Sequence, residues 1–281
     1  MSTKSGEDYQ DISDQGVVRY YLNNSRVFDL AKQLGYKLII FANQFGWMSN
    51  NPNADYIVKH FYISELFSVM MHKTLLIDIK FIRNKVTQDI RHITFSTFNK
   101  LKIIKEKFNS PIFVHAHIYA PHEPFLFTRN GSAFTEHLID YGKLYRVTDE
   151  KYYNWYINQI IFTNSKLIEV INEILKDKEK LPVIILQGDH GIHYIDWSKK
   201  SNYKQERFEV FAAYYLPHGG NKLINEDMQP SNIFRVVFNY YFDYDFEMIQ
   251  DTKFPRNPVY METTDKWKEN IRKKHLLLPL D

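Results

Sequence analysis

Pro182-Val-Ile-Ile-Leu-Gln-Gly-Asp-His-Gly-Ile-His193 is the segment that indicates the fold most clearly. Its apolar first half is typical of a short strand that is buried on both faces of a parallel sheet. The preceding residues, 149–177, begin with acidic residues and have apolar residues at helical spacing, and Lys176 and Lys178 lie at their end. The apolar residues expected on one face of this helix are Ile157, Ile160, Ile161, Leu167, Ile168, Ile171, Ile174 and Leu175. A helix that leads into a buried strand is typical of an α/β fold.

The same alternation of helices and strands extends outward from this segment. The pattern predicts further strands at 36–42, 111–117 and 209–215. It predicts further helices at 23–34, 56–71, 92–107 and 230–242. Such an alternation favours a mostly parallel sheet with helices on both faces. We therefore expect a polar lead-in over residues 1–22, one α/β domain over 23–249 and an irregular tail over 250–281.

The composition excludes several classes of function. The chain has 281 residues and no cysteine, which excludes disulfides, thiolate metal sites and a cysteine nucleophile. Its 36 basic and 33 acidic residues nearly balance, so we expect no nucleic-acid partner. No apolar run approaches the ~20 residues of a membrane-spanning helix, and the N-terminus lacks the apolar region of a signal peptide. For the chain as written we expect no membrane segment and a cytoplasmic location.

Histidine and aspartate side chains follow two of the predicted strands. His115, His117 and His122 lie at the end of the strand at 111–117, and Asp189, His190 and His193 follow the strand at 182–187. The carboxyl ends of parallel strands meet at one edge of a sheet, where ligands bind. Imidazole and carboxylate are the usual ligands of Zn²⁺ and Mn²⁺. Each residue alone reads as a structural histidine or a helix cap, but together they favour a metal site.

The two segments that carry these histidine and aspartate residues resemble a known superfamily. The segment 183–191, with its Gly188-Asp189-His190-Gly191 end, is similar to the Asp-His-Gly block of the alkaline phosphatase and sulfatase superfamily. His117, four residues, His122, one residue, Pro124 and an aromatic residue resemble the upstream block of phosphoethanolamine transferases. Lipoteichoic acid synthases have a related element. The resemblance covers residues 23–245 and implies an alkaline phosphatase-like fold.

The resemblance also implies a reaction class. Members cleave or transfer phosphate or sulfate esters with a divalent metal, here Zn, Mn, Mg or Ca. By position, Asp189 and His190 would be metal ligands. His117 and His122 would contact the phosphoryl or sulfuryl group of the substrate, or a second metal. Either His193 or His218 would add a further substrate contact.

The chain departs from the superfamily at its N-terminal end. The superfamily's first acidic ligand and its nucleophile precede the region where the resemblance begins, so we expect the N-terminal strand or strands to be lacking. Ser49 and Thr74 are the nearest hydroxyls in loops, and Ser49 reads as a turn residue. Two functions therefore stay open: a sulfatase-like hydrolase or transferase, and a non-catalytic module that binds a ligand or partner. A membrane-anchored parent would place the domain outside the cytoplasm, and a second copy covering the sheet edge would make a homo-oligomer.

Overall fold

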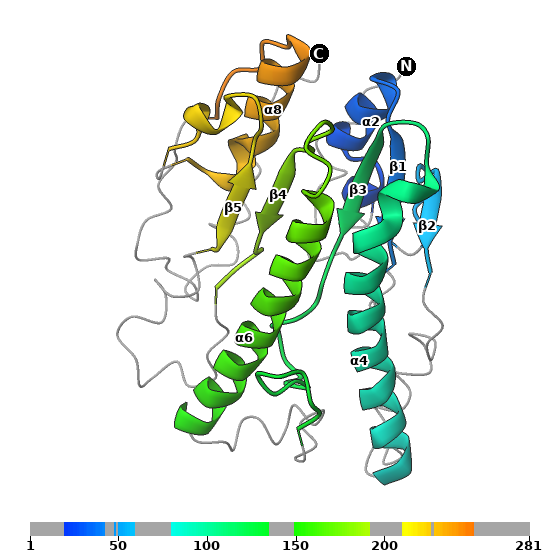
Figure 1. Cartoon of the computed structure of the whole chain (residues 1–281), viewed down its shortest axis with the longest axis vertical. Coiled ribbons are helices and arrows are strands. Elements are labelled where there is room, and N and C mark those ends of the chain that lie inside the picture. The colour runs from blue at the N-terminus through cyan, green and yellow to red at the C-terminus, as the bar shows by residue number, and fades with distance from the viewer. Residues whose placement is uncertain are drawn as a thin grey trace, which may run out of the picture. The chain divides into compact units, whose positions relative to one another are not determined.

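The computed structural model describes residues 20–42, 48, 50–59, 80–134, 149–191, 210–225 and 228–249 (Figure 1). The chain divides into two compact units. The larger unit is Arg19–Pro182, and the smaller unit combines Met1–Val18 with Val183–Asp281. Within the described ranges, no helix combines the length and the apolar character needed to cross a bilayer.

A three-stranded parallel sheet forms the centre of the larger unit. Its strands are β1 (Lys37–Phe41), β2 (Tyr56–Val58) and β3 (Ile112–Ala116), in the order β2-β1-β3. Ile39 is paired with Tyr56 on one side and with Val114 on the other. The parallel pairing confirms the prediction for the strands at 36–42 and 111–117.

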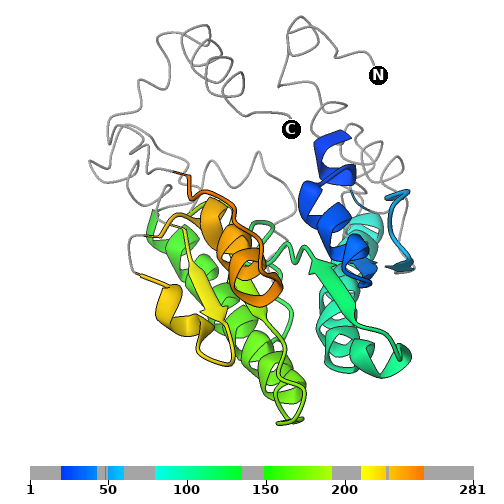
Figure 2. The same ribbon diagram turned by 90° about the horizontal axis from the view of Figure 1, so that it is seen from above.

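Helices cover both faces of this sheet (Figure 2). Because side chains alternate along a strand, Leu38 and Ile40 face one side of the sheet, where they pack against Phe28 of α2 (Arg26–Gln33). Ile39 and Phe41 face the other side and pack with Ile104 of η3 (Ile104–Lys107), the 3-10 turn that ends α4 (Lys80–Ile103). Each of these four strand side chains is at most 1% exposed, and each contributes roughly 1.5–3 kcal/mol by burial. The prediction of helices on both faces is confirmed for this sheet.

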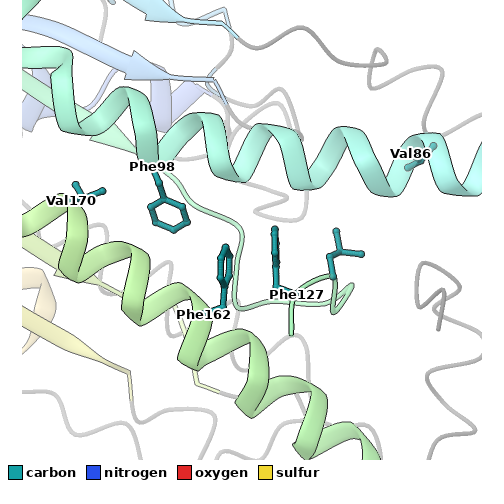
Figure 3. Packing of buried hydrophobic residues seen from close by; sticks show 6 residues of the cluster. Val86, Phe98, Phe127, Phe162 and Val170 are labelled. Carbon is teal, nitrogen blue, oxygen red and sulfur yellow. The ribbon is translucent and has the colours of Figure 1, made fainter. Parts of the chain in front are cut away.

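An aromatic core joins α4 to α6 (Asp149–Ile174) (Figure 3). Phe98 comes from α4, Phe162 from α6, and Phe127 from the loop that follows β3. The rings of Phe127 and Phe162 are stacked with their centroids 4.2 Å apart. The loop after β3 is therefore packed between the two long helices.

Two expectations for the larger unit were wrong in part. Residues 56–58 of the helix expected at 56–71 form strand β2, and residues 60–79 lie outside the described residues. The buried side of α6 is also not the isoleucine-rich face that we expected, since Ile157, Ile161 and Ile168 are 40–58% exposed. The side chains that α6 buries are Tyr152, Trp155, Gln159, Phe162, Thr163 and Val170. The helix has apolar residues on more than one side, and the side with the large aromatic rings buries more surface.

The smaller unit contains an antiparallel pair of strands and a short helix. β4 (Ile184–Gln187) pairs with β5 (Ala212–Tyr215), from Ile184 opposite Tyr215 to Gln187 opposite Ala212. Two 3-10 turns, η4 (Gly220–Leu223) and η5 (Pro230–Asn232), lead to α8 (Ile233–Phe242). The buried core of this unit is formed by Leu216, Ile233, Val236 and Val237. The strand positions agree with the prediction, but the parallel pairing expected for them is wrong, because a short apolar run does not specify the direction of its partner.

Candidate functional site

The carboxyl ends of β1 and β3 lie at one edge of the three-stranded sheet. Ala42 follows β1, and His117 follows β3. Both residues line a cavity of about 10 Å³, together with Thr94 and Thr97 of α4. This volume holds about one water molecule. The structure thus places His117 at the edge of the sheet where a ligand was expected, next to a small hollow.

Gln159 of α6 fastens the loop that carries His122. Its Oε1 accepts hydrogen bonds from the backbone N–H groups of Leu126 at 2.7 Å and Phe127 at 3.3 Å. Its Nε2 donates to the carbonyl oxygens of His122 at 2.8 Å and Pro121 at 3.1 Å. The side chain is only 1% exposed, so it satisfies loop groups that solvent does not reach. The loop backbone is therefore held in a fixed position relative to α6.

The His122 ring is held by its neighbours. Its Nδ1 lies 2.7 Å from the carbonyl oxygen of Glu123 and 3.5 Å from the Oε2 atom of the same residue. A carbonyl oxygen can only accept, so Nδ1 carries the proton and donates. The ring also lies against Tyr119, with centroids 4.5 Å apart. These contacts define the orientation of the imidazole.

Glu123 is a buried carboxylate, only 7% exposed. The hydroxyl of Tyr152 donates to its Oε2 at 3.4 Å. Burial, followed by the charge of Glu123, raises the pKa of Tyr152 well above its ordinary value. Tyr152 therefore keeps its proton and remains a hydrogen-bond donor to Glu123.

His115 packs against helix α2 of the larger unit. Its ring packs edge-on against Phe28 of α2, with centroids 5.6 Å apart. Burial, with a smaller contribution from the charge of His117, lowers the pKa of His115 to about 4. His115 is therefore neutral at neutral pH, and its half-buried ring packs on the core residue Phe28.

Asp189 and His190 follow β4 in the smaller unit. The backbone N–H of Gly188 donates to the carbonyl oxygen of Phe211 at 2.8 Å, which continues the strand pairing as far as this segment. The His190 backbone N–H donates to Asp189 Oδ1 at 3.0 Å. His190 Nδ1 lies 2.7 Å from the carbonyl oxygen of Gly191, so Nδ1 carries the proton. The basic nitrogen is then Nε2, which lies 3.8 Å from Asp189 Oδ2.

This pair suits part of a metal site. A metal-binding histidine commonly donates its other ring N–H to a backbone carbonyl, which fixes the tautomer, and His190 makes this contact with Gly191. The side chain of Asp189 is 80% exposed, so its carboxylate is accessible. Within the described ranges, no three histidine, aspartate or glutamate side chains gather closely enough to hold an ion. Asp189 and His190 would therefore supply two ligands of a larger set.

The predicted site residues belong to both units. His117 and His122 belong to the larger unit, whereas Asp189, His190 and His218 belong to the smaller unit. His218 follows β5, and Asp189 follows β4. Because the two strands are antiparallel, these residues lie at different ends of the strand pair. It lies in an exposed turn with φ 57, where its carbonyl accepts a 2.7 Å hydrogen bond from the Tyr240 hydroxyl. The predicted contact His193 lies outside the described residues, as do Ser49 and Thr74.

Sequence reasoning missed Glu123, Tyr152 and Gln159. Glu123 stands between His122 and Pro124 inside the block that carries the resemblance, and this position was a usable signal. Gln159 is a polar residue on the side of α6 that also buries Trp155 and Phe162. No spacing rule links it to a loop more than 30 residues away.

The chain was compared with protein-family models, with curated proteins and with solved structures, and none of them matches it. The resemblance of the two histidine blocks to the alkaline phosphatase and sulfatase superfamily therefore stays a prediction.

Proposed function

We propose that the chain is a metal-dependent hydrolase or transferase that acts on phosphate or sulfate esters. The observation that carries this proposal is the geometry of Asp189 and His190. An accessible carboxylate and an imidazole with Nδ1 tied to a carbonyl stand 3.8 Å apart at the end of β4. This donor set suits Zn²⁺ or Mn²⁺. A bound divalent cation would neutralise charge on the ester oxygens.

The histidines of the larger unit support the substrate class. His117 follows β3 at the carboxyl edge of a parallel sheet, where α/β proteins bind ligands. His122 is five residues further on, in a loop whose backbone bonds to both the oxygen and the nitrogen of the Gln159 amide. Imidazole N–H groups donate hydrogen bonds to tetrahedral oxyanions. In the proposed reaction these two side chains bind and orient the phosphoryl or sulfuryl group.

The test combines metal binding with catalysis in the full chain. Binding of Zn²⁺ and Mn²⁺ is measured by calorimetry, and hydrolysis is measured with an aryl phosphate and an aryl sulfate. The site variants are Asp189→Ala and His190→Ala. The matched controls are Asp245→Ala and His92→Ala, which remove an exposed aspartate and an exposed histidine elsewhere.

We expect stoichiometric metal in the native chain and in both controls. Mutation of a residue that only supports a metal ligand weakens metal binding by up to about 100-fold. Loss of a ligand itself should therefore weaken metal binding by more than about 100-fold. Turnover should fall in parallel. Metal binding without turnover of either ester would favour the non-catalytic binding module instead. Equal metal affinity in the native chain and in both site variants would refute the assignment of Asp189 and His190.

A further inference from the structure

We propose that Glu123 is a positioning residue for His122. Its carbonyl oxygen and its buried carboxylate both lie at Nδ1 and favour a proton there. Nε2 is then the ring nitrogen that meets the phosphate or sulfate ester, to which it donates a hydrogen bond when the ring carries both protons. The inference rests on the proposed function for the identity of the ester, but the arrangement of Glu123 and His122 can be tested without it.

The burial of Glu123 is the first observation. A carboxylate that is 7% exposed has lost most of its hydration, which is costly unless polar neighbours compensate. Two such neighbours of Oε2 are the Tyr152 hydroxyl at 3.4 Å and His122 Nδ1 at 3.5 Å. Because Tyr152 keeps its proton, it donates to the carboxylate and directs it from one side. The carboxylate therefore stands between a fixed donor and the imidazole.

The second observation is that the loop backbone is held separately from the ring. Gln159 bonds to the backbone of Pro121, His122 and Leu126. Glu123 contacts the imidazole at Nδ1. The two residues therefore have separable effects. A change at Glu123 alters the ring, whereas a change at Gln159 releases the loop.

A comparison with His190 supports the assignment. Both histidines have Nδ1 2.7 Å from the carbonyl oxygen of the next residue. The carboxylate near His190 lies beside Nε2, at 3.8 Å, whereas the carboxylate near His122 lies beside Nδ1. His190 Nε2 and the Asp189 carboxylate are thus placed as neighbouring metal ligands, whereas the charge of Glu123 lies beside Nδ1 of His122, away from Nε2. The carbonyl contact is therefore common to both histidines, and the carboxylate beside Nδ1 is what His122 has in addition.

The test reads the tautomer of His122 and the kinetics in parallel. Ring ¹⁵N shifts are recorded on the full chain at pH ~8, above the ordinary imidazole pKa. The His122 signals are assigned by their loss in His122→Gln. The variants are Glu123→Gln, which keeps the shape and removes the charge, and Glu123→Leu, which removes both. Glu106→Gln, at an exposed position of η3, is the matched control. Circular dichroism and thermal melting report whether each variant folds, and Tyr152→Phe provides a milder change if Glu123→Leu does not.

We expect His122 to carry its proton on Nδ1 in the native chain and in Glu106→Gln. The backbone carbonyl of residue 123 remains in the variants, so removing the Glu123 charge should lower the Nδ1–H population without abolishing it. It should also lower kcat about 10-fold or more, as the loss of an orienting partner usually does, with KM changed less than about 2-fold. An unchanged tautomer in Glu123→Gln and in Glu123→Leu, or in Tyr152→Phe where Glu123→Leu does not fold, would overturn the positioning role. This holds whatever the kinetics. If the native chain turns over neither ester, the proposed function fails, while the tautomer still decides the role of Glu123.

Discussion

Gln159 and His122 are joined by a 2.8 Å hydrogen bond, from the Nε2 of a helix residue to a loop carbonyl 37 positions earlier in the chain. The same amide accepts from the Leu126 N–H at 2.7 Å. Leucine at 159 would fill much of the same volume but leave these backbone groups buried without partners. Each unpaired buried group costs about 1–3 kcal/mol. We expect Gln159→Leu to lower the free energy of unfolding by about 2–4 kcal/mol, measured by urea denaturation.

The control for this change is Gln88→Leu, at an exposed position of α4. It should alter stability by no more than about 0.5 kcal/mol. Similar losses in the two variants would mean that the amide of Gln159 has no special role in holding the loop.

Gly131 is a second point at which the loop depends on the long helices. Its φ is +83, and a Cβ built there would lie 2.8 Å from Cε2 of Phe162. Phe162 stacks on Phe127, so neither ring can move away easily. Overpacking of this kind costs about 1–3 kcal/mol, in addition to about 1 kcal/mol for the left-handed backbone. Gly131→Ala should therefore lower the free energy of unfolding by about 2–4 kcal/mol.

Gly35→Ala separates the two contributions. Gly35 has nearly the same φ, +84, but a Cβ there would have no atom within 4 Å. Thermal or urea unfolding of this variant should show only the backbone cost, about 1 kcal/mol. The prediction for Gly131 fails if the two alanine variants lose equal stability.

His115 should make the stability of the protein depend on pH. Burial and the charge of His117 lower its native pKa to about 4, whereas an unfolded histidine has a pKa near 6.5. Between these values the unfolded chain binds more protons than the native chain, so stability rises with pH across this window and falls as the solution is acidified. The difference amounts to up to about 3 kcal/mol.

His115→Gln removes this titration. We expect the free energy of unfolding of the native chain to fall more than that of the variant between pH ~7.5 and pH ~4.5, in urea melts at each pH. His92→Gln, at an exposed position of α4, should retain the native dependence. Parallel pH profiles for the native chain and His115→Gln would contradict the prediction.

The strand β1 shows how far local pattern predicts this fold. Leu38, Ile39, Ile40 and Phe41 form an uninterrupted apolar run, and all four side chains are buried between helices on the two faces of the sheet. A run of this kind requires cover on both faces, so the strand and its setting could be predicted from the sequence alone. The positions of α2, α6, β4 and α8 were predictable for similar reasons.

The rest depends on contacts that no local pattern encodes. α6 has isoleucines on one side and aromatic residues on another, so its periodicity allowed either side to be the buried one. The buried side is the one on which Phe127, from the loop after β3, stacks on Phe162. In the site, adjacency alone predicted that Asp189 and His190 would lie together. The antiparallel direction of β5, which separates His218 from them, depends on pairing between distant segments.

The assignment of Asp189 and His190 predicts that metal ions stabilise the native chain. A ligand that binds only the folded state raises the free energy of unfolding by RT ln(1 + [L]/Kd), which is about 2.7 kcal/mol at 100 times Kd. Both residues belong to the short segment that continues the β4–β5 pairing, so a bound ion would also hold this segment in place. Zn²⁺ or Mn²⁺ should therefore raise the melting temperature of the native chain, and a chelator should reverse the rise.

The double variant Asp189→Ala/His190→Ala tests whether this stabilisation arises at the proposed ligands. Added metal should not raise its melting temperature, because neither side chain is left to bind the ion. Asp245→Ala/His92→Ala removes one aspartate and one histidine from exposed positions elsewhere and should keep the full metal-induced shift. Metals also bind unfolded histidines, which reduces the shift in every variant by a similar amount, so the comparison between the two double variants is the informative one. An equal shift in both would place the ion elsewhere in the chain and remove the main support for a metal-dependent ester hydrolase or transferase.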